Sequence, residues 1–158
     1  MMTHIVAAFL LILTVMLPGA NAWAGPTLEH VRGNNLIRCG VNEHLIGFAQ
    51  KDGAGKWQGF EIDFCRAVAA AVLGDGGKVN FVPVTAPSRF PVLLSGKIDL
   101  LMRNTTYTFD REGALGVRFA GIYYYDGQAF MVPRSSGIKS LAQLNGATIC
   151  LGQRTTHE

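Results

Sequence analysis

The segment IDLLMRNTTYTFDR, residues 98–111, is where the sequence changes most abruptly from apolar to polar. It begins with an apolar run, Ile98–Met102, that Asp99 alone interrupts and that follows a break at Gly96. Such a run predicts a strand buried on both faces. Amide and hydroxyl side chains follow it directly, at Asn104, Thr105, Thr106 and Thr108. Open α/β sheets bind ligands just beyond the carboxyl ends of their strands, so these side chains form a candidate ligand site.

Arg111 is the second notable feature of this segment. We expect Asp110 to cap a short helix that starts at Arg111, although a cation is disfavoured in the first turn of a helix. A local conflict of this kind is typical of a functional position. The competing interpretation is an ordinary turn, in which the Thr and Asn residues only shape the loop and Arg111 is a solvated surface charge. The segment alone leaves both interpretations open.

Composition limits the classes of protein to consider. The chain has 158 residues, of which 49% are hydrophobic and 16% charged, as expected for one globular domain. Its formal net charge is +3, and its Lys and Arg residues are scattered singly after residue 30, so nucleic acid is not an expected partner. No second ligand lies at metal spacing from His44, and we predict neither a metal site nor a cofactor.

Residues 1–24 have the pattern of a cleaved signal peptide. Ile5–Leu17 is apolar except for Thr14, and small residues in the pattern of a cleavage site follow it, which predicts a mature chain that starts at Trp23 or Gly25 in the periplasm. The n-region has no Lys or Arg, so a retained signal anchor is the alternative.

Export places the cysteines in an oxidising compartment. We predict a disulfide between Cys39 and Cys65, because Cys65 lies on the apolar face of its predicted helix. Two buried free thiols are the alternative, since a free cysteine is itself a commonly buried residue. Cys150 is left without an identified partner.

The order of the predicted elements indicates an α/β fold with a mostly parallel sheet. Strands are predicted at 36–41, 79–84 and 98–102, helices at 59–73 and from Ser88 to about Leu94, and a hairpin around the Gly-rich turn 51–56. Beyond these, a short helix near 27–35, strands at 128–132 and 148–151, and a helical turn at 141–144 capped by Ser140 are predicted. Glu61 and Asp63 are interpreted as first-turn carboxylates that suit the helix dipole.

Four motifs together resemble the family 3, type II periplasmic solute-binding proteins of ABC importers, and among them the general L-amino acid subfamily. The motifs are RCGVN at 38–42, GFEIDFC at 59–65, residues 96–111, and YYYDGQ at 123–128; a weaker fifth covers 145–158. The resemblance implies a two-lobed clamshell, with residues 25–127 as lobe one and 128–158 as a hinge strand and the start of an incomplete lobe two. It also implies a chain truncated early in lobe two.

The resemblance further implies a role for each site residue. Arg111 matches the arginine that binds the α-carboxylate of an L-amino acid, and Asn104 and Thr106 match the positions that bind its α-amino group. Thr155 and Thr156 match the start of a lobe-two helix whose N–H groups complete the carboxylate site. The implied partners are an amino acid and the permease subunits of an ABC transporter, and the implied state is a monomer.

The sequence departs from the family pattern in three ways: at Arg154, near Ala86, where one aromatic wall of the ligand pocket has no match, and in the lobe-two aspartate for the α-ammonium, which would lie beyond Glu158. Arg154 stands where the family has glycine, and its side chain would crowd the turn if its φ were positive. Two other functions share this fold: the sensor domain of a membrane receptor and a periplasmic dehydratase. Around Asn104–Arg111 there is no pair of carboxylates of the kind that a dehydratase needs, so binding is favoured over catalysis.

Overall fold

The computed structural model describes residues 25–158. The chain divides into two compact units, residues 1–30 and Val31–Glu158. Helix α2, Pro26–Asn34, begins in the first unit, and the predicted signal peptide lies outside the described residues. Within the described part, no helix is long and apolar enough to cross a membrane.

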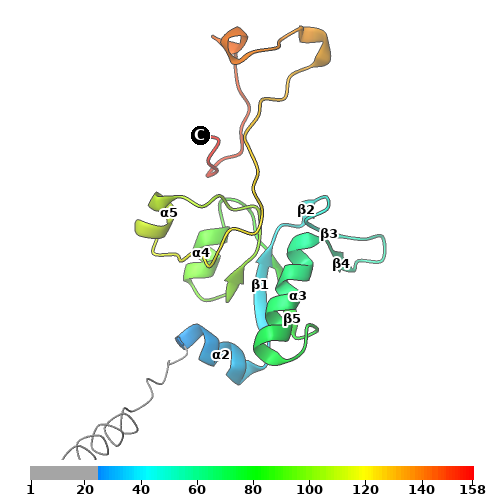
Figure 1. The fold of residues 1–158 in the computed structure, drawn as a ribbon, viewed down its shortest axis with the longest axis vertical. Coiled ribbons are helices and arrows are strands. Elements are labelled where there is room, and N and C mark those ends of the chain that lie inside the picture. Colours follow the sequence, from blue (N-terminus) through cyan, green and yellow to red (C-terminus); the bar gives the residue numbers. More distant parts are fainter. Residues whose placement is uncertain (1–24) are drawn as a thin grey trace, which may run out of the picture. The chain divides into compact units, whose positions relative to one another are not determined.

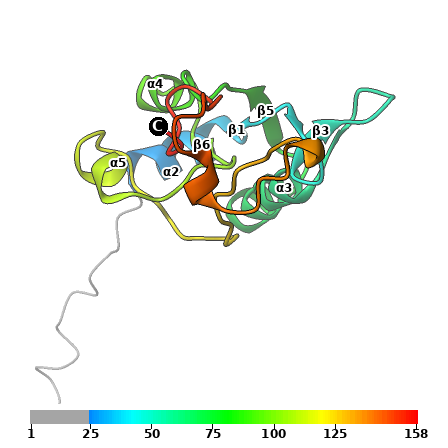
Figure 2. The same ribbon diagram turned by 90° about the horizontal axis from the view of Figure 1, so that it is seen from above.

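The central sheet is parallel, as predicted. Strand β1, Ile37–Val41, lies in the middle, with β5, Val79–Pro83, on one side and β6, Leu100–Leu101, on the other. Cys39 aligns with Phe81 in β5 and with Leu100 in β6. The middle position of β1 is visible in Figures 1 and 2, where it runs beside β5. An interior strand with neighbours on both edges explains why β1 is almost entirely buried.

Strand β6 is much shorter than the strand predicted at 98–102. Asp99, the polar residue inside the apolar run, holds this short strand in place through its hydrogen bonds to Arg38. The Asp99 carboxylate accepts hydrogen bonds from the Arg38 backbone N at 2.9 Å, Nε at 3.0 Å and Nη2 at 2.6 Å. A carboxylate that accepts both side-chain and backbone N–H groups joins β1 to the start of β6 more firmly than a surface ion pair would.

Helix α3, Phe60–Leu73, packs against β1 and β5 and forms the main core. Ile62, Cys65 and Ala69 are fully buried on its inner face. The helix ends at Gly74, whose φ of 73° and N–H bond to Ala70 O confirm the predicted C-cap. The disulfide between Cys39 and Cys65 is also confirmed, with Cα atoms 6.3 Å apart, and it joins the middle strand to this helix.

A small antiparallel sheet precedes α3. It consists of β2, His44–Leu45, β3, Ala49–Lys51, and β4, Trp57–Gln58, and the β3–β4 pair is the predicted hairpin. Gly59 follows β4 with a φ of 121°, and a Cβ there would collide with the carbonyl of Phe48. Only glycine fits this close approach of two backbones, which positions the start of α3.

The remaining helices are short. α4, Arg89–Leu94, lies next to β6, and Ser88 precedes it without capping it. The Ser88 hydroxyl is engaged by Thr85 instead, at 2.9 Å from both its backbone N and its Oγ1, so the predicted capping role of Ser88 is wrong. α5 spans Phe109–Gly113.

The C-terminal segment, residues 125–158, has almost no regular structure. Two 3-10 helices, η1 at Arg134–Ser136 and η2 at Leu141–Leu144, interrupt an extended chain. Ser140 precedes η2, and its backbone N donates to Gln143 Oε1 at 3.1 Å, as in the predicted cap. The strands predicted at 128–132 and 148–151 are absent, because no other described strand pairs with them.

Candidate functional site

Arg111 belongs to the short helix α5, which follows β6 through the polar loop. The helix is capped by Thr108, whose Oγ1 accepts a hydrogen bond from the Arg111 backbone N at 3.2 Å. Asp110 lies inside the helix, so its predicted capping role is wrong. Thr108 has the extended backbone that a cap requires, and its hydroxyl reaches the N–H three residues later.

The guanidinium of Arg111 is buried rather than solvated. The residue is 8% exposed, its Nη1 donates to Thr106 O at 2.6 Å, and its Cζ lies 5.4 Å from the centre of the Phe90 ring. Burial lowers the pKa of Arg111 below its ordinary value. These contacts contradict the interpretation of Arg111 as a plain surface charge.

Two further arginines are buried beside this loop, and the sequence analysis identified neither. Arg89 is 2% exposed, donates to Asn104 O at 3.4 Å and to Arg154 O at 3.2 Å, and lies over the Phe90 ring. Arg103 is 7% exposed, and its Nε and Nη1 have no hydrogen-bond partner. Burial, together with repulsion from Arg111 and Arg103, lowers the pKa of Arg89 to about 10.

No carboxylate of the described residues forms an ion pair with Arg89, Arg103 or Arg111. The three arginines therefore lie in one poorly solvated region, where Arg89 and Arg111 donate to backbone carbonyl oxygens and Nε and Nη1 of Arg103 have no partner. Buried charges are costly unless they are paired, so this arrangement favours an anion that comes from outside the chain. A carboxylate, like a phosphate, is an anion that a guanidinium binds with two parallel hydrogen bonds.

The polar side chains of the loop lie next to the arginines and are largely exposed. Asn104 Oδ1 accepts a hydrogen bond from Asn42 Nδ2 at 3.2 Å, at the end of β1. Thr106 Oγ1 lies 3.2 Å from Thr156 Oγ1, so two site residues from distant parts of the sequence are in contact. Thr155 Oγ1 donates to Gly152 O at 2.7 Å.

Gln128 and Arg154 hold the last residues of the chain near this loop. Gln128 Nε2 donates to Thr156 O at 2.8 Å, and Arg154 O accepts the bond from Arg89. No helix begins at Thr155 or Thr156 in the described chain. Arg154 has a φ of 55°, which meets the condition under which a side chain crowds this turn.

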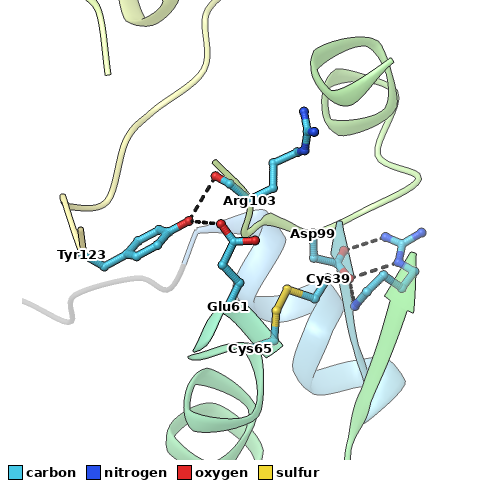
Figure 3. Close-up of a disulfide and its surroundings, with 7 residues drawn as sticks. Cys39, Glu61, Cys65, Asp99, Arg103 and Tyr123 are labelled. Atoms are coloured by element: carbon cyan, nitrogen blue, oxygen red, sulfur yellow. Dashed lines mark hydrogen bonds and ion pairs between the residues drawn. A yellow bond between two sulfur atoms is a disulfide. The ribbon is translucent and has the colours of Figure 1, made fainter. Parts of the chain in front are cut away.

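Glu61 lies in the first turn of α3, as predicted, but its burial was not expected. It is fully buried at the start of α3, and its Oε1 lies 3.0 Å from the hydroxyl of Tyr123 (Figure 3). Burial raises the pKa of Glu61 to about 7. Arg89 could have been found from the signal used for Arg111, a cation in the first turn of a helix, but nothing in the local pattern indicates that Glu61 is buried.

Comparison with known proteins finds relatives that match most of this chain. Residues 37–149 match the model of the bacterial extracellular solute-binding proteins, family 3. The chain is 49% identical to the general L-amino acid-binding periplasmic protein AapJ of Rhizobium johnstonii, over 91% of this chain and 42% of AapJ. It is 48% identical to the glutamate/glutamine/aspartate/asparagine-binding protein BztA of Rhodobacter capsulatus, over 88% of this chain and 41% of BztA.

A solved structure shows the same fold. The periplasmic binding protein of an ABC transporter from Brucella ovis, with glutathione bound, superimposes with a TM-score of 0.77 at 49% identity, over 84% of this chain and 42% of that protein. The chain thus spans less than half of the length of each of these relatives.

Proposed function

This chain belongs to family 3 of the bacterial extracellular solute-binding proteins, and we propose that it binds L-amino acids in the periplasm for delivery to an ABC transporter. The observation that carries the proposal is the group of three buried arginines without a carboxylate partner. An amino acid would supply the carboxylate that the arginines lack. Its ammonium group would bind the exposed side-chain oxygens of the same loop.

Arg111 is the proposed anchor of the α-carboxylate. Its Nη1 is already oriented by Thr106 O, which leaves the other guanidinium N–H groups for the ligand. Asn104 and Thr106 offer side-chain oxygens on the exposed side of the same loop, where an α-ammonium needs acceptors. Thr156, in contact with Thr106, and Thr155 are proposed to contribute from the C-terminal part of the site.

The two additional arginines favour ligands that have a second anionic group. Arg89 and Arg103 raise the positive potential around the site, and Nε of each is buried without a partner. BztA is named for glutamate and aspartate as well as their amides, and the Brucella protein holds glutathione, a peptide with two carboxylates. We therefore expect acidic amino acids to be among the ligands.

The remaining parts of the proposal concern the protein as a whole. Residues 1–24 act as a signal peptide, residues 25–127 as lobe one, and residues 128–158 as the hinge segment and the first part of lobe two. The working form is a monomer that docks on the permease subunits. Catalysis is not proposed: both oxygens of the Glu112 carboxylate, next to Arg111 in the chain, already accept hydrogen bonds, from the Tyr107 hydroxyl at 3.0 Å and from Phe119 N at 3.4 Å.

The experiment is calorimetry with a panel of L-amino acids, on a chimera that joins this chain to the part of AapJ that follows the matched region. We expect micromolar or tighter binding, and Arg111→Ala should weaken it by about thirtyfold or more, the cost of leaving a bound carboxylate unpaired. Arg111→Lys should restore only part of the affinity, because an ammonium cannot bind a carboxylate bidentately.

Arg118→Ala is the matched control. Arg118 is exposed and lies seven positions further along the chain, so its loss should leave the affinity unchanged. Folding of each variant is verified by circular dichroism. A folded chimera that binds no amino acid would contradict the proposed function, and unchanged affinity on loss of Arg111 would contradict its role as the anchor.

A further inference from the structure

We propose that Glu61 holds a proton and, through the hydroxyl of Tyr123, positions the carbonyl of Arg103 and with it the ligand loop 104–111, so that ligand affinity falls when this proton is lost. Glu61 and Tyr123 are thus positioning residues that do not touch the ligand. The coupling to affinity rests on the proposed function, whereas the proton on Glu61 does not.

The three groups form a short buried chain of polar atoms (Figure 3). The Tyr123 hydroxyl lies 3.0 Å from Glu61 Oε1 and 3.0 Å from the backbone O of Arg103. Glu61 is 0% exposed, and its Oε2 has no partner. In the figure the carboxyl group points from the start of α3 toward the hydroxyl, and the Arg103 carbonyl points to the same atom from the other side.

The number of hydrogens available to these groups determines the protonation state of Glu61. A tyrosine hydroxyl has one hydrogen to donate, but an ionised Glu61 and the Arg103 carbonyl both require it. If Glu61 Oε1 carries a proton, it donates to the Tyr123 oxygen, and the hydroxyl then donates to Arg103 O. Both contacts are satisfied only in the protonated state, and an unsatisfied buried acceptor is costly.

The electrostatic surroundings agree with this assignment. Burial raises the pKa of Glu61 to about 7 from an ordinary 4.5, although the Tyr123 hydrogen bond and the charge of Arg103 act in the opposite direction. The other charged groups in this region are in ion pairs: Asp63 of α3 with Arg66, and Asp99 with Arg38 of β1. Cys39 and Cys65 form the disulfide and do not titrate.

Loss of the proton changes the hydrogen bond on the ligand loop. The ionised carboxylate is the stronger acceptor and takes the tyrosine hydrogen, so Arg103 O loses its donor. Arg103 lies between Met102, whose N donates to Gly40 O at 2.8 Å, and Asn104, whose O accepts a hydrogen bond from Arg89 at 3.4 Å. The Tyr123 ring stays in place against Phe60 and Phe64, with centroids 5.8 Å and 5.4 Å away.

The first test measures the stability of the chain itself as a function of pH. A carboxyl group whose pKa is higher in the folded state binds its proton on folding, so stability is greatest below the unfolded pKa and falls as pH rises from about 4.5 to about 7. Glu61→Gln, which keeps a donor to the Tyr123 oxygen and cannot ionise, should remove this slope from the urea-unfolding midpoint. Glu43→Gln is the control: it removes an exposed carboxylate that pairs with Lys51, and the dependence of stability on pH should remain.

The second test measures the affinity of the AapJ chimera for L-glutamine between pH 5 and pH 8, where the ligand does not change its charge. Affinity should fall about three- to tenfold with rising pH, because the loop loses one hydrogen bond and this range corresponds to the free energy of one such bond. Glu61→Gln should give a flat profile at the higher affinity, and Tyr123→Phe a flat profile at the lower one.

The outcomes separate the two proposals. A stability slope that Glu61→Gln leaves unchanged would overturn the proton on Glu61. A slope in stability without one in affinity would overturn the coupling to the ligand loop. Absence of amino acid binding at every pH would overturn the proposed function. The dependence of the unfolding midpoint on pH would still show whether Glu61 is protonated.

Discussion

The sheet region and the C-terminal segment of this chain have similarly apolar sequences but very different structures. In residues 31–113, strands β1, β5 and β6 pair in parallel, with α3 packed against β1 and β5 and α4 next to β6. In residues 125–158 no residue is buried; Met131 is 100% exposed and Tyr125 83%. The difference teaches that an apolar run becomes a strand only where a ladder partner and a covering element are both available.

The largest effect expected from this difference concerns the disulfide. Replacing Cys39 and Cys65 with alanine should destabilise the sheet region by about 3–4 kcal/mol. The bond joins residues 26 positions apart and thereby lowers the conformational entropy of the unfolded chain, and the substitutions remove this constraint. Urea unfolding followed by circular dichroism measures this loss.

Cys150→Ser is the control within the C-terminal segment. Cys150 is free and exposed, so its substitution should change stability by less than about 0.5 kcal/mol. Equal effects of the two changes would mean that the regions do not differ in stability as the structure indicates.

A smaller effect is expected at two glycines, one in each region. Gly59→Ala should cost about 2–3 kcal/mol, because its φ of 121° and the nearby Phe48 carbonyl both exclude a Cβ. Gly127→Ala should have almost no effect, since nothing lies within 4 Å of the added Cβ. Thermal unfolding of the two variants provides the comparison, which a similar loss in both would contradict.

Much of the sheet region could be predicted from the sequence. The alternation of apolar strands with the helix at 59–73 indicated the parallel sheet, and Gly74 and the Cys39–Cys65 pair were placed correctly. The predicted strands at 128–132 and 148–151 are wrong for a physical reason. Strand formation depends on pairing with distant residues, and a local pattern contains no information about whether such a partner exists.

The smallest effect concerns the strained turn at Arg154. Arg154→Gly should stabilise the folded chain by up to about 1 kcal/mol, because glycine adopts a φ of 55° without the Cβ clash but is more flexible when unfolded. Arg154→Ala retains the Cβ and should give no gain. A gain from alanine equal to that from glycine would show that the arginine side chain, rather than the backbone, causes the strain.

The candidate site was predictable only in part. Arg111 stood out because its charge conflicts with a helix start, and Asn104 and Thr106 because they follow a buried strand. The burial of Arg89, Arg103 and Glu61 depends on contacts across the fold, such as Arg89 with Arg154 O. Sequence position gives no indication of such contacts, which determine how strongly the site attracts an anion.

The central claim is that the buried arginines bind the carboxylate of the ligand. The most direct measurement is calorimetry of the AapJ chimera with L-glutamine and with L-glutamine amide, in which a neutral carboxamide replaces only the α-carboxylate. The amide should bind about thirtyfold more weakly or worse, because Arg111 would remain buried without an anion. Equal affinity for the two ligands would contradict the claim.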